Sequence, residues 1–347
     1  MAMAHDHDNQ RGSKSILATV TALALAVTCL VIAASNDDNV TVQGDHRQLH
    51  LDLVDPKTVS PRIVEYIISQ NAAGEEIGSE ACKSHIMFST FRCFEDSSAC
   101  TPLRQRIEEN TFKVWSSFPE EVTFKAIHSS KLESNEYGVP ILKNMYLNMM
   151  EECPNALTYT YINGDIIGTH AFIDSINAAL SVGKDFLMVG KRFNVQWHES
   201  WDVEAEDLDW INKPGKLFMR SAEDYFTVTK NAIDWETIPP LVIGRIGYDN
   251  WLVDHAYHKS NVVLVDATYS AKMVHQTERS NRSVGGDTVN ADRNYNINIL
   301  QEAGLEVGDH GFTTNAEYQT SPTNPISIRH RRDWSYENAK ENGYDSE

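Results

Sequence analysis

A short polar motif, Asn163-Gly164-Asp165, follows directly after the apolar run ALTYTYI at residues 156–162. Gly164 allows the backbone to turn or to approach a ligand closely. A carboxylate in the place of Asp165 can bind a divalent cation, which in turn neutralises a diphosphate. Asn-Gly-Asp is also ordinary turn chemistry. The motif therefore predicts either a ligand site or a simple turn at the end of a strand.

Two single residues further along the chain could also take part in chemistry. Asp249, in the run GRIGYDNWL at residues 244–252, stands where a helix is expected to begin. It could act as a general base, or it could cap the helix, as Asn250 also could. His275 lies at the end of the segment VDATYSAKMVHQ at residues 265–276. A histidine in such a place serves as a metal ligand or as a hydrogen-bonded structural residue.

The segments that would position these residues alternate between strand-like and helix-like patterns. Strands are predicted at 85–91, 121–127, 156–162 and 185–195. The helices between them are predicted at 102–118, from Pro140 through 150, and after Thr169, a candidate cap. Three such alternations with short connections predict parallel βαβ units with right-handed crossovers. Open sheets of this kind bind ligands beyond the carboxyl ends of their strands, where residue 165 would lie.

The later half of the chain is less regular. Strand-like runs occur at 224–229, 240–245 and 261–267, and a helix is predicted around 250–257. Beyond about residue 313 the sequence is polar and rich in Glu, Asn and Lys, which predicts a mobile tail.

Six segments, taken in series, resemble GT-A-type glycosyltransferases, and they are most similar to glycosyltransferase-like proteins of the nucleotide-diphospho-sugar transferase superfamily. The segments are NEYGVP (135–140), YINGDI (161–166), FLMVGKRFNV (186–195), IGRIGYDNWL (243–252), VDAT (265–268) and VHQ (274–276). The resemblance covers roughly residues 84–280. It implies an α/β fold with a GT-A-like (Rossmann-like), mostly parallel sheet flanked by helices.

The resemblance also assigns roles to individual residues. Asp165 matches the last acid of the family's Asp-x-Asp metal motif, whereas Asn163 stands at the first acid and departs from the pattern. His275 matches the late metal-ligating histidine, so the implied cofactor is a divalent cation, Mn²⁺ or Mg²⁺, held by Asp165 and His275. Asp249 matches the acid of the acceptor-side motif, which is the base in inverting members. The residues implied to bind the donor are Asn163, Gly164, Asp165 and, by position only, Arg92.

The implied activity is the transfer of a sugar from a nucleotide-diphosphate-sugar donor to a hydroxyl of a glycan or glycoconjugate acceptor. A cation can stabilise the leaving diphosphate, and a carboxylate can take the proton of the attacking hydroxyl. Two alternatives stay open. A catalytically silent protein could bind sugar nucleotide or glycan, because Asn163 replaces an acid. An anchored hydrolase could use Asp249 and His275.

The N-terminal part predicts a membrane anchor. Residues 15–35 carry no charge and would be roughly 30 Å long as a helix, enough to cross the lipid bilayer. Basic residues precede this stretch and acidic residues follow it, which favours a single-pass type II protein with its catalytic domain in the Golgi or ER lumen. Secretion after cleavage of a signal peptide is the alternative. The expected regions are a cytosolic tail (1–15), the anchor (16–35), a stem (36–79), the catalytic domain (80–312) and the tail (313–347).

The composition bears on the class of partner and on cysteine chemistry. The 347 residues include 49 acidic and 30 basic side chains, a formal net charge of −19, which argues against nucleic-acid binding. If the domain is lumenal, Asn39 and Asn281 are glycosylation acceptors. Four cysteines outside the apolar stretch allow three pairings, as disulfides or free thiols: Cys82, Cys93, Cys100 and Cys153.

Overall fold

The computed structural model describes residues 82–95, 100–118, 120–128, 131–196, 203, 215–219, 221–277 and 292–331. All of them belong to the compact unit Glu80–Glu347. The expected cytosolic tail, anchor and stem lie outside the described residues, as do both glycosylation acceptors, Asn39 and Asn281.

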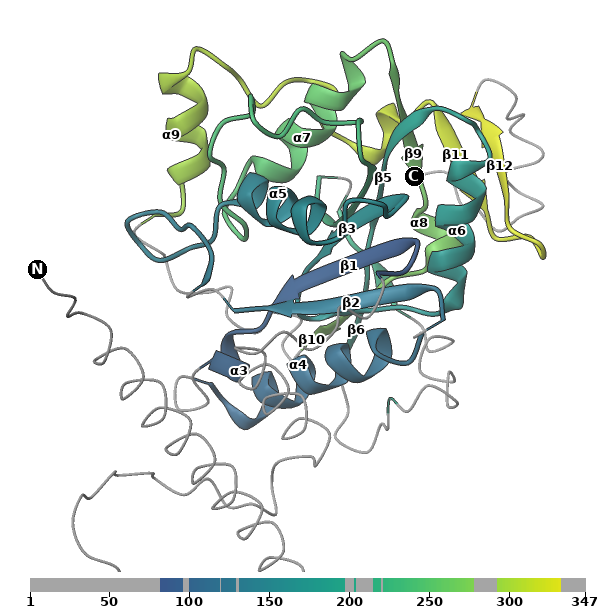
Figure 1. Cartoon of the computed structure of the whole chain (residues 1–347), viewed down its shortest axis with the longest axis horizontal. Helices are drawn as coiled ribbons and strands as arrows, with labels where there is room; N and C mark the ends of the chain where they lie inside the picture. Colours follow the sequence, from purple (N-terminus) through teal and green to yellow (C-terminus); the bar gives the residue numbers. More distant parts are fainter. Residues whose placement is uncertain are drawn as a thin grey trace, which may run out of the picture. The chain divides into compact units, whose positions relative to one another are not determined.

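An eight-stranded sheet forms the centre of the described unit, in the order β12-β11-β9-β5-β8-β3-β1-β2 (Figure 1). Its strands are β1 (His85–Thr90), β2 (Val122–Ile127), β3 (Thr158–Ile162), β5 (Asp185–Lys191), β8 (Glu223–Thr229), β9 (Val262–Asp266), β11 (Tyr318–Ser321) and β12 (Ser327–His330). The pairs β1–β2, β1–β3, β5–β9 and β9–β11 are parallel. β8 runs antiparallel to both β3 and β5, and β12 runs antiparallel to β11.

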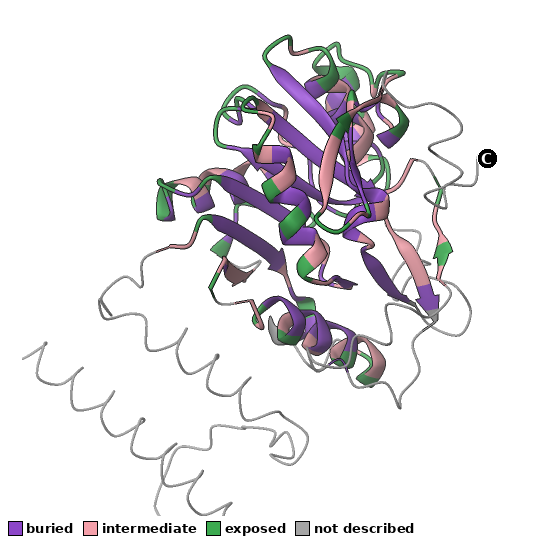
Figure 2. Cartoon of the chain, turned by 90° about the vertical axis from the view of Figure 1, so that its right-hand side faces the viewer, coloured by how far each residue is buried: buried purple, intermediate pink, exposed green. Residues whose placement is uncertain are grey.

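Helices cover both faces of this sheet. One face packs against α5 (Leu142–Glu152), α7 (Tyr248–Tyr257) and α9 (Tyr295–Glu302). The other packs against α4 (Pro102–Trp115), α6 (His170–Leu180) and the short α8 (Thr268–Ala271), and α3 (Arg92–Glu95) precedes α4. The strands of the main sheet are largely buried (Figure 2). TYTYI in β3 and VVLVD in β9 are buried at every position, as expected for strands covered on both faces.

A second, four-stranded sheet has the order β4-β10-β6-β7. Its strands are β4 (Ile166–Ile167), β10 (Val274–Thr277), β6 (Phe193–Gln196) and β7 (Lys216–Leu217). β4 follows the motif at 163–165, and β10 pairs with it so that His275 lies opposite Ile166. This small sheet therefore brings two segments that are far apart in sequence to the same place.

Two disulfide bonds settle the cysteine pairing that the sequence left open. Cys82 is bonded to Cys153, which joins the residues before β1 to the end of α5. Cys93 is bonded to Cys100, which closes the loop between α3 and α4.

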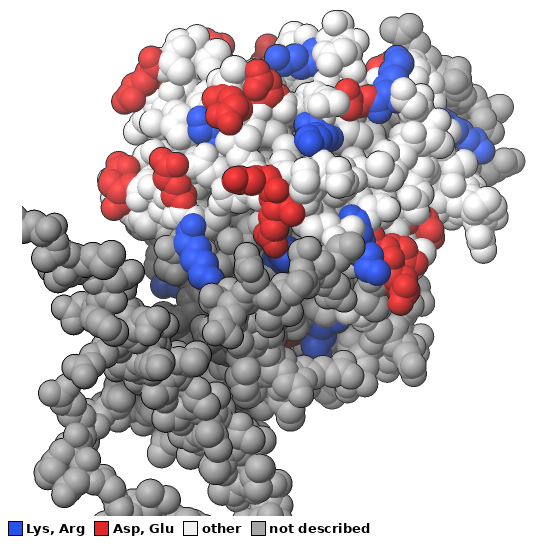
Figure 3. Space-filling model, viewed as in Figure 1, with Lys and Arg blue, Asp and Glu red and all other residues white. Residues whose placement is uncertain are grey.

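Charges of both signs share the surface. On the face shown in Figure 3, Lys and Arg side chains lie among Asp and Glu side chains. Lys125 and Glu152, for example, form an ion pair at 2.6 Å. Such an exposed pair contributes little to stability, about 0–1 kcal/mol.

The predicted architecture needs correction. The protein is a mixed α/β fold whose main sheet is only partly parallel, because β8 is inserted antiparallel in its middle and β12 runs antiparallel at its end. The predicted membrane-spanning helix, and with it the type II membrane localisation, finds no support. Across the residues that the structure describes, none of the helices combines the length and apolarity needed to cross a bilayer. The stretch 16–35 itself lies outside those residues.

Two segments differ from their predicted form. Residues 240–245 make an isolated bridge between Val242 and Ile141 in place of a strand. The amide of Asn296 satisfies that backbone: its Oδ1 accepts from the Val242 N–H at 2.8 Å, and its Nδ2 donates to the Val242 carbonyl at 2.9 Å. The expected tail from residue 313 onward instead supplies β11 and β12, which extend the main sheet beyond β9.

Candidate functional site

Polar side chains gather at the edge of the main sheet where β3 and β5 end. Because β8 runs antiparallel to both, its first residues lie at this same edge. Ile162 at the end of β3 pairs with Tyr225, and Lys191 at the end of β5 pairs with Glu223. The edge thus collects the motif after β3, the residues after β5 and the start of β8.

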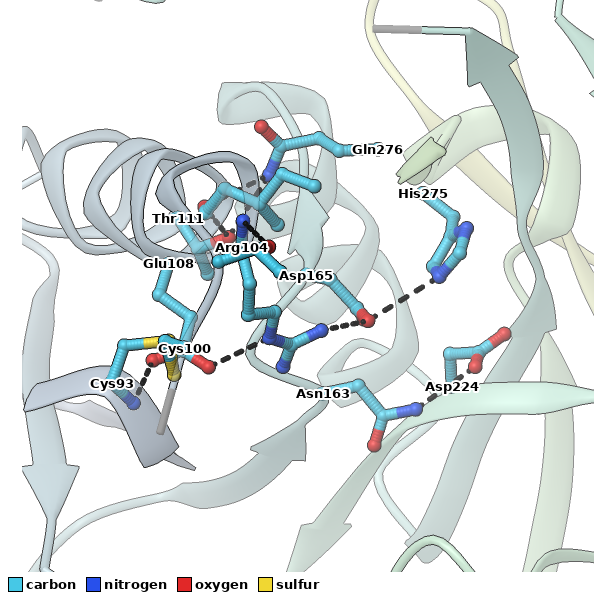
Figure 4. A network of polar contacts seen from close by, with 12 residues as sticks. Cys93, Cys100, Arg104, Glu108, Thr111, Asn163, Asp165, Asp224, His275 and Gln276 are labelled. Atoms are coloured by element: carbon cyan, nitrogen blue, oxygen red, sulfur yellow. Dashed lines mark hydrogen bonds and ion pairs between the residues drawn. A yellow bond between two sulfur atoms is a disulfide. The ribbon is translucent and has the colours of Figure 1, made fainter. Parts of the chain in front are cut away.

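Asp165 and His275 meet at this edge. The Oδ2 of Asp165 lies 3.4 Å from the Nε2 of His275, whose side chain is 3% exposed (Figure 4). Gly164 lets the motif approach β1, because a Cβ at this position would stand 2.8 Å from the carbonyl oxygen of Thr90. The Nδ1 of His275 is buried and has no hydrogen-bond partner among the described residues.

A guanidinium group shares the same carboxylate. Arg104, in the first turns of α4, donates from Nη1 to Oδ2 of Asp165 at 3.0 Å and from Nε to Oε1 of Glu108 at 2.8 Å. Glu108 is fully buried, and its Oε2 accepts from the backbone N–H of Cys93 at 2.8 Å. Figure 4 shows Arg104 and His275 approaching Asp165 from opposite sides. A chain of contacts thus holds Asp165 in place: it runs from the Cys93–Cys100 disulfide through Glu108 to Arg104.

The surroundings of Asp165 favour its charged form. Burial acts to raise the pKa of Asp165, but the facing His275 and the guanidinium of Arg104 outweigh burial and hold this pKa well below its usual range. Burial also raises the pKa of Glu108, although Arg104 opposes that shift. Asp165 is therefore a carboxylate at neutral pH.

Asn163 is held by its neighbours. Its Nδ2 donates to Oδ1 of Asp224 at 2.9 Å, and its Oδ1 accepts from the hydroxyl of Tyr161 at 2.9 Å. Arg192, the residue after β5, forms a short hydrogen-bonded ion pair with the same oxygen of Asp224. An aspartate in the place of Asn163 would face the Asp224 carboxylate directly. Asn163 thus avoids a contact between two like charges at this position.

Asp249 lies in the first turn of α7, as the sequence predicted. The N-cap position belongs to Gly247, whose backbone is left-handed at φ 96°, so neither Asp249 nor Asn250 is the cap. Oδ1 of Asp249 accepts from the backbone N–H of Asn250 at 3.0 Å. The side chain of Asn250 instead donates to the carbonyl of Gly311 at 2.7 Å. The interpretation of Asp249 or Asn250 as the helix cap is therefore wrong, and their side chains make the contacts given above.

Carboxyl groups surround Asp249. Burial, with a contribution from the charge of Asp224, raises the pKa of Asp249 to about 7. Burial, with the charges of Asp249 and Asp224, raises the pKa of Glu223 to about 9. Glu223 is 2% exposed, and one of its carboxyl oxygens has no hydrogen-bond partner in the described part of the chain. At neutral pH, Glu223 is protonated and Asp249 is poised between its two states.

The structure brings together most of the residues that the sequence singled out. One group contains Asn163, Gly164, Asp165 and His275. Asp224 links this group to Asp249, because it accepts a hydrogen bond from Asn163 and its charge acts on the pKa of Asp249. Arg92 is an exposed residue of α3, and its expected contact with the donor stays a prediction. The residues that sequence reasoning missed are Arg104, Arg192, Glu223 and Asp224.

A cavity of about 960 Å³ lies elsewhere, between α6, α8 and the segment 322–328. Its lining contains none of Asp165, Asp249 and His275. It also lacks the convergent charges of the sheet edge, so the candidate site remains at that edge.

No family model, no curated protein and no solved structure matches the chain. The mixed α/β fold holds, at the same edge, one carboxylate compensated by positive charge, Asp165, and one whose pKa is raised, Asp249. Such an arrangement can bind an anionic ligand near its cations and transfer a proton beside it.

Proposed function

We propose that this chain is a glycosyltransferase that moves a sugar from a nucleotide-diphosphate-sugar donor to a hydroxyl of a glycan or glycoconjugate. The observation that carries the proposal is the contact between Asp165 and His275, at 3.4 Å. Sequence resemblance pairs these two residues as metal ligands although they lie far apart in the chain. Their meeting at the carboxyl edge of the sheet, where ligands of open α/β sheets bind, supports that pairing.

On the donor side, Asp165 and His275 would hold a divalent cation together with oxygens of the donor diphosphate. Their facing Oδ2 and Nε2 atoms are close enough for one ion to bind both, and the carboxylate is charged. When bound, Mn²⁺ or Mg²⁺ stabilises the negative charge of the leaving diphosphate. Arg104 and Arg192 add fixed positive charge at the same place, and their guanidinium geometry suits phosphate oxygens.

On the acceptor side, Asp249 would act as the general base. A base with a pKa near 7 is charged in about half of the molecules at neutral pH and can accept a proton readily. Asp249 takes the proton of the acceptor hydroxyl as its oxygen attacks the anomeric carbon, and the bond to the nucleoside diphosphate breaks. The protonated Glu223 is able to donate a hydrogen bond beside it.

The proposal is tested by thermal unfolding of the full chain with a panel of nucleotide sugars, each with Mn²⁺ and with chelator. We expect one nucleotide class to raise the unfolding temperature, more strongly with Mn²⁺, and to support sugar transfer to a glycan acceptor. Asp165→Ala serves as the matched variant and should lose the metal-dependent part of the shift. Unchanged unfolding with every nucleotide sugar would contradict the proposal.

A catalytically silent sugar-nucleotide-binding or glycan-binding protein is the second candidate. It is favoured by one observation: the amide of Asn163 is bonded to Asp224 and Tyr161, so it supplies no charge for a cation. Stabilisation by a nucleotide sugar without any transfer or hydrolysis would select this candidate. Hydrolysis of the donor without an acceptor would instead indicate a hydrolase that uses Asp249 and His275.

A further inference from the structure

A second group of possible metal ligands lies at the C-terminal end of α7, apart from the sheet edge. One ligand atom from each of Asp254, His258 and His310 lies within 4.8 Å of the other two. Asp254 and His258 are four residues apart on one helix and so share a face. His310 belongs to the segment that follows α9.

The separations between each histidine and the carboxylate are close to those around one tetrahedral ion, although they run to different oxygens of Asp254. Nδ1 of His258 lies 3.4 Å from Oδ2 of Asp254, and Nδ1 of His310 lies 3.6 Å from Oδ1 of Asp254. Two atoms bound to a zinc ion at about 2.0–2.1 Å are separated by about 3.3–3.4 Å in tetrahedral geometry. The three ligand atoms all lie within 4.8 Å of one another, so the side chains must move closer together to bind one ion.

The segment that carries His310 is seated on the Asp254 carboxylate. Gly308 has φ 85°, and a Cβ at this position would stand 2.1 Å from Cγ of Asp254. The backbone N–H of His310 donates to Oδ1 of Asp254 at 2.9 Å. The ring of Tyr257 stacks on that of His310, with centroids 4.3 Å apart and planes at 4°. The glycine, the hydrogen bond and the stacked ring together fix how His310 faces the carboxylate.

We propose that Asp254, His258 and His310 form a zinc site, with water completing the coordination. Two imidazoles and one carboxylate are ligands that zinc prefers, whereas Mg²⁺ and Ca²⁺ prefer oxygen atoms alone. Zinc replaces the hydrogen bond between Nδ1 of His258 and the carbonyl of Asp254, which is 2.9 Å long. Each histidine binds zinc through a ring nitrogen that carries no proton.

The site has a structural role. Zinc links the segment around His310 to the end of α7, and the neighbouring Gly311 already accepts from Asn250 at the start of the same helix, at 2.7 Å. One short segment therefore contacts both ends of the helix that carries Asp249. Since zinc binds the folded arrangement, it stabilises the fold by mass action.

The proposal is tested on the full chain after metal removal by chelator, with zinc chloride as the probe. Calorimetric titration and thermal unfolding should show zinc binding and a rise in the unfolding temperature, and Mg²⁺ should not replace zinc. His258→Ala and His310→Ala should each lower zinc affinity at this site by at least roughly tenfold and remove most of the thermal shift. Both rings are well exposed, so unfolding in chelator should change little.

His170→Ala is the matched control. His170 also lies near two acids, but Glu121 faces its Nε2 and Asp174 faces its Nδ1, so no single ion can bind all three. This variant should bind zinc as the unchanged chain does. His5 and His7 can bind zinc on their own. The decisive measurement is therefore the number of zinc ions bound per chain, which should be lower by one in His258→Ala and in His310→Ala than in the unchanged chain. The proposal is overturned if zinc causes no shift, or if both variants keep every equivalent.

Discussion

Two carboxylates stand at one edge of the sheet in opposite electrical surroundings. Asp165 faces Arg104 and His275, and its pKa is held well below the usual range. Asp249 lies near Glu223 and Asp224, and burial with like charge raises its pKa to about 7. Pairs of acids whose surroundings push their pKa values apart take different chemical roles. One side of the edge is therefore suited to holding negative charge, and the other to exchanging protons.

Asp224 divides the two sides. Its Oδ1 accepts hydrogen bonds from both Arg192 and Asn163, so this oxygen belongs to the Asp165 side, where positive charge balances the carboxylates. Its Oδ2 has no hydrogen-bond partner within the described ranges, and its charge acts on Asp249. Substitutions on the Asp165 side should therefore change donor binding, and substitutions on the Asp249 side should change the transfer rate and its pH dependence.

The largest expected effect is that of Asp249→Asn. The substitution keeps the size of the side chain and removes the base, so sugar transfer should fall by roughly 100- to 10,000-fold. Donor affinity should stay unchanged, because the proposed donor site lies on the Asp165 side. The measurement is steady-state transfer together with donor titration.

The pH profile of the same reaction sharpens this test. In the unchanged chain, transfer should rise with pH through about 7 as Asp249 loses its proton. Asp234→Asn, at an exposed aspartate, is the matched control and should keep both rate and profile. An Asp249→Asn protein that transfers sugar normally would remove this residue from the mechanism.

The next effect is that of Asp165→Ala on donor binding. It removes the carboxylate that faces Arg104 and His275, so affinity for the donor in Mn²⁺ should fall by at least roughly tenfold. Asp174→Ala, at an exposed aspartate of α6, should bind the donor normally. Titrations in Mn²⁺ and in chelator separate two outcomes. Equal affinity of the unchanged chain in both would show that the guanidinium groups act without metal.

Asn163→Asp tests the boundary between the two sides. It replaces a hydrogen bond to Asp224 with two facing carboxylates, which should destabilise the fold by about 1–3 kcal/mol. Mn²⁺ should recover part of that loss, because a cation can sit between the two acids. Urea unfolding with and without Mn²⁺ measures the loss of stability and its recovery. Asn163→Ala is the control, because it removes the hydrogen bond without adding charge. An aspartate no more destabilising than alanine would contradict the electrostatic explanation.

The smallest expected effect concerns Glu223 and the pH dependence of stability. Its pKa is raised from 4.5 to about 9 on folding, so the folded chain binds more protons than the unfolded chain between these values. The associated stability is complete below about pH 4 and is lost as the pH rises through about 9. Glu223→Gln should abolish this loss and unfold at least roughly 2–4 °C higher than the unchanged chain at pH 9. The same difference in unfolding temperature between Glu223→Gln and the unchanged chain at pH 5 and at pH 9 would argue against this role of Glu223.

Local elements could be predicted because local patterns determine them. The run at 85–91 forms β1, and Thr169 caps α6 by accepting from the N–H of Ala171 at 3.3 Å. Both follow from side chains within a few residues of one another. The meeting of Asp165 with His275 was expected only through the resemblance, since no local pattern joins them.

The direction of β8 could not be predicted in this way. EDYFTVT reads as a buried strand whichever way it runs, and its direction depends on which strands become its neighbours. Its antiparallel insertion carries Glu223 and Asp224 to the carboxyl edge, where a parallel strand would have placed its other end. Arg104 was missed for a similar reason, because its partner Asp165 belongs to a distant part of the chain. Tertiary packing determines both the direction of β8 and the pairing of Arg104 with Asp165.

The last two strands set where the chain can be shortened. β11 pairs with β9, and Arg331 reaches back from the end of β12 to Oδ2 of Asp266 at 2.7 Å. A chain cut at residue 312 would uncover the backbone of β9, whose side chains VVLVD are all buried. An unpaired apolar strand of this kind is a template for pairing between molecules. Such a truncation should therefore aggregate, whereas one that keeps Arg331 should stay monodisperse in size-exclusion chromatography.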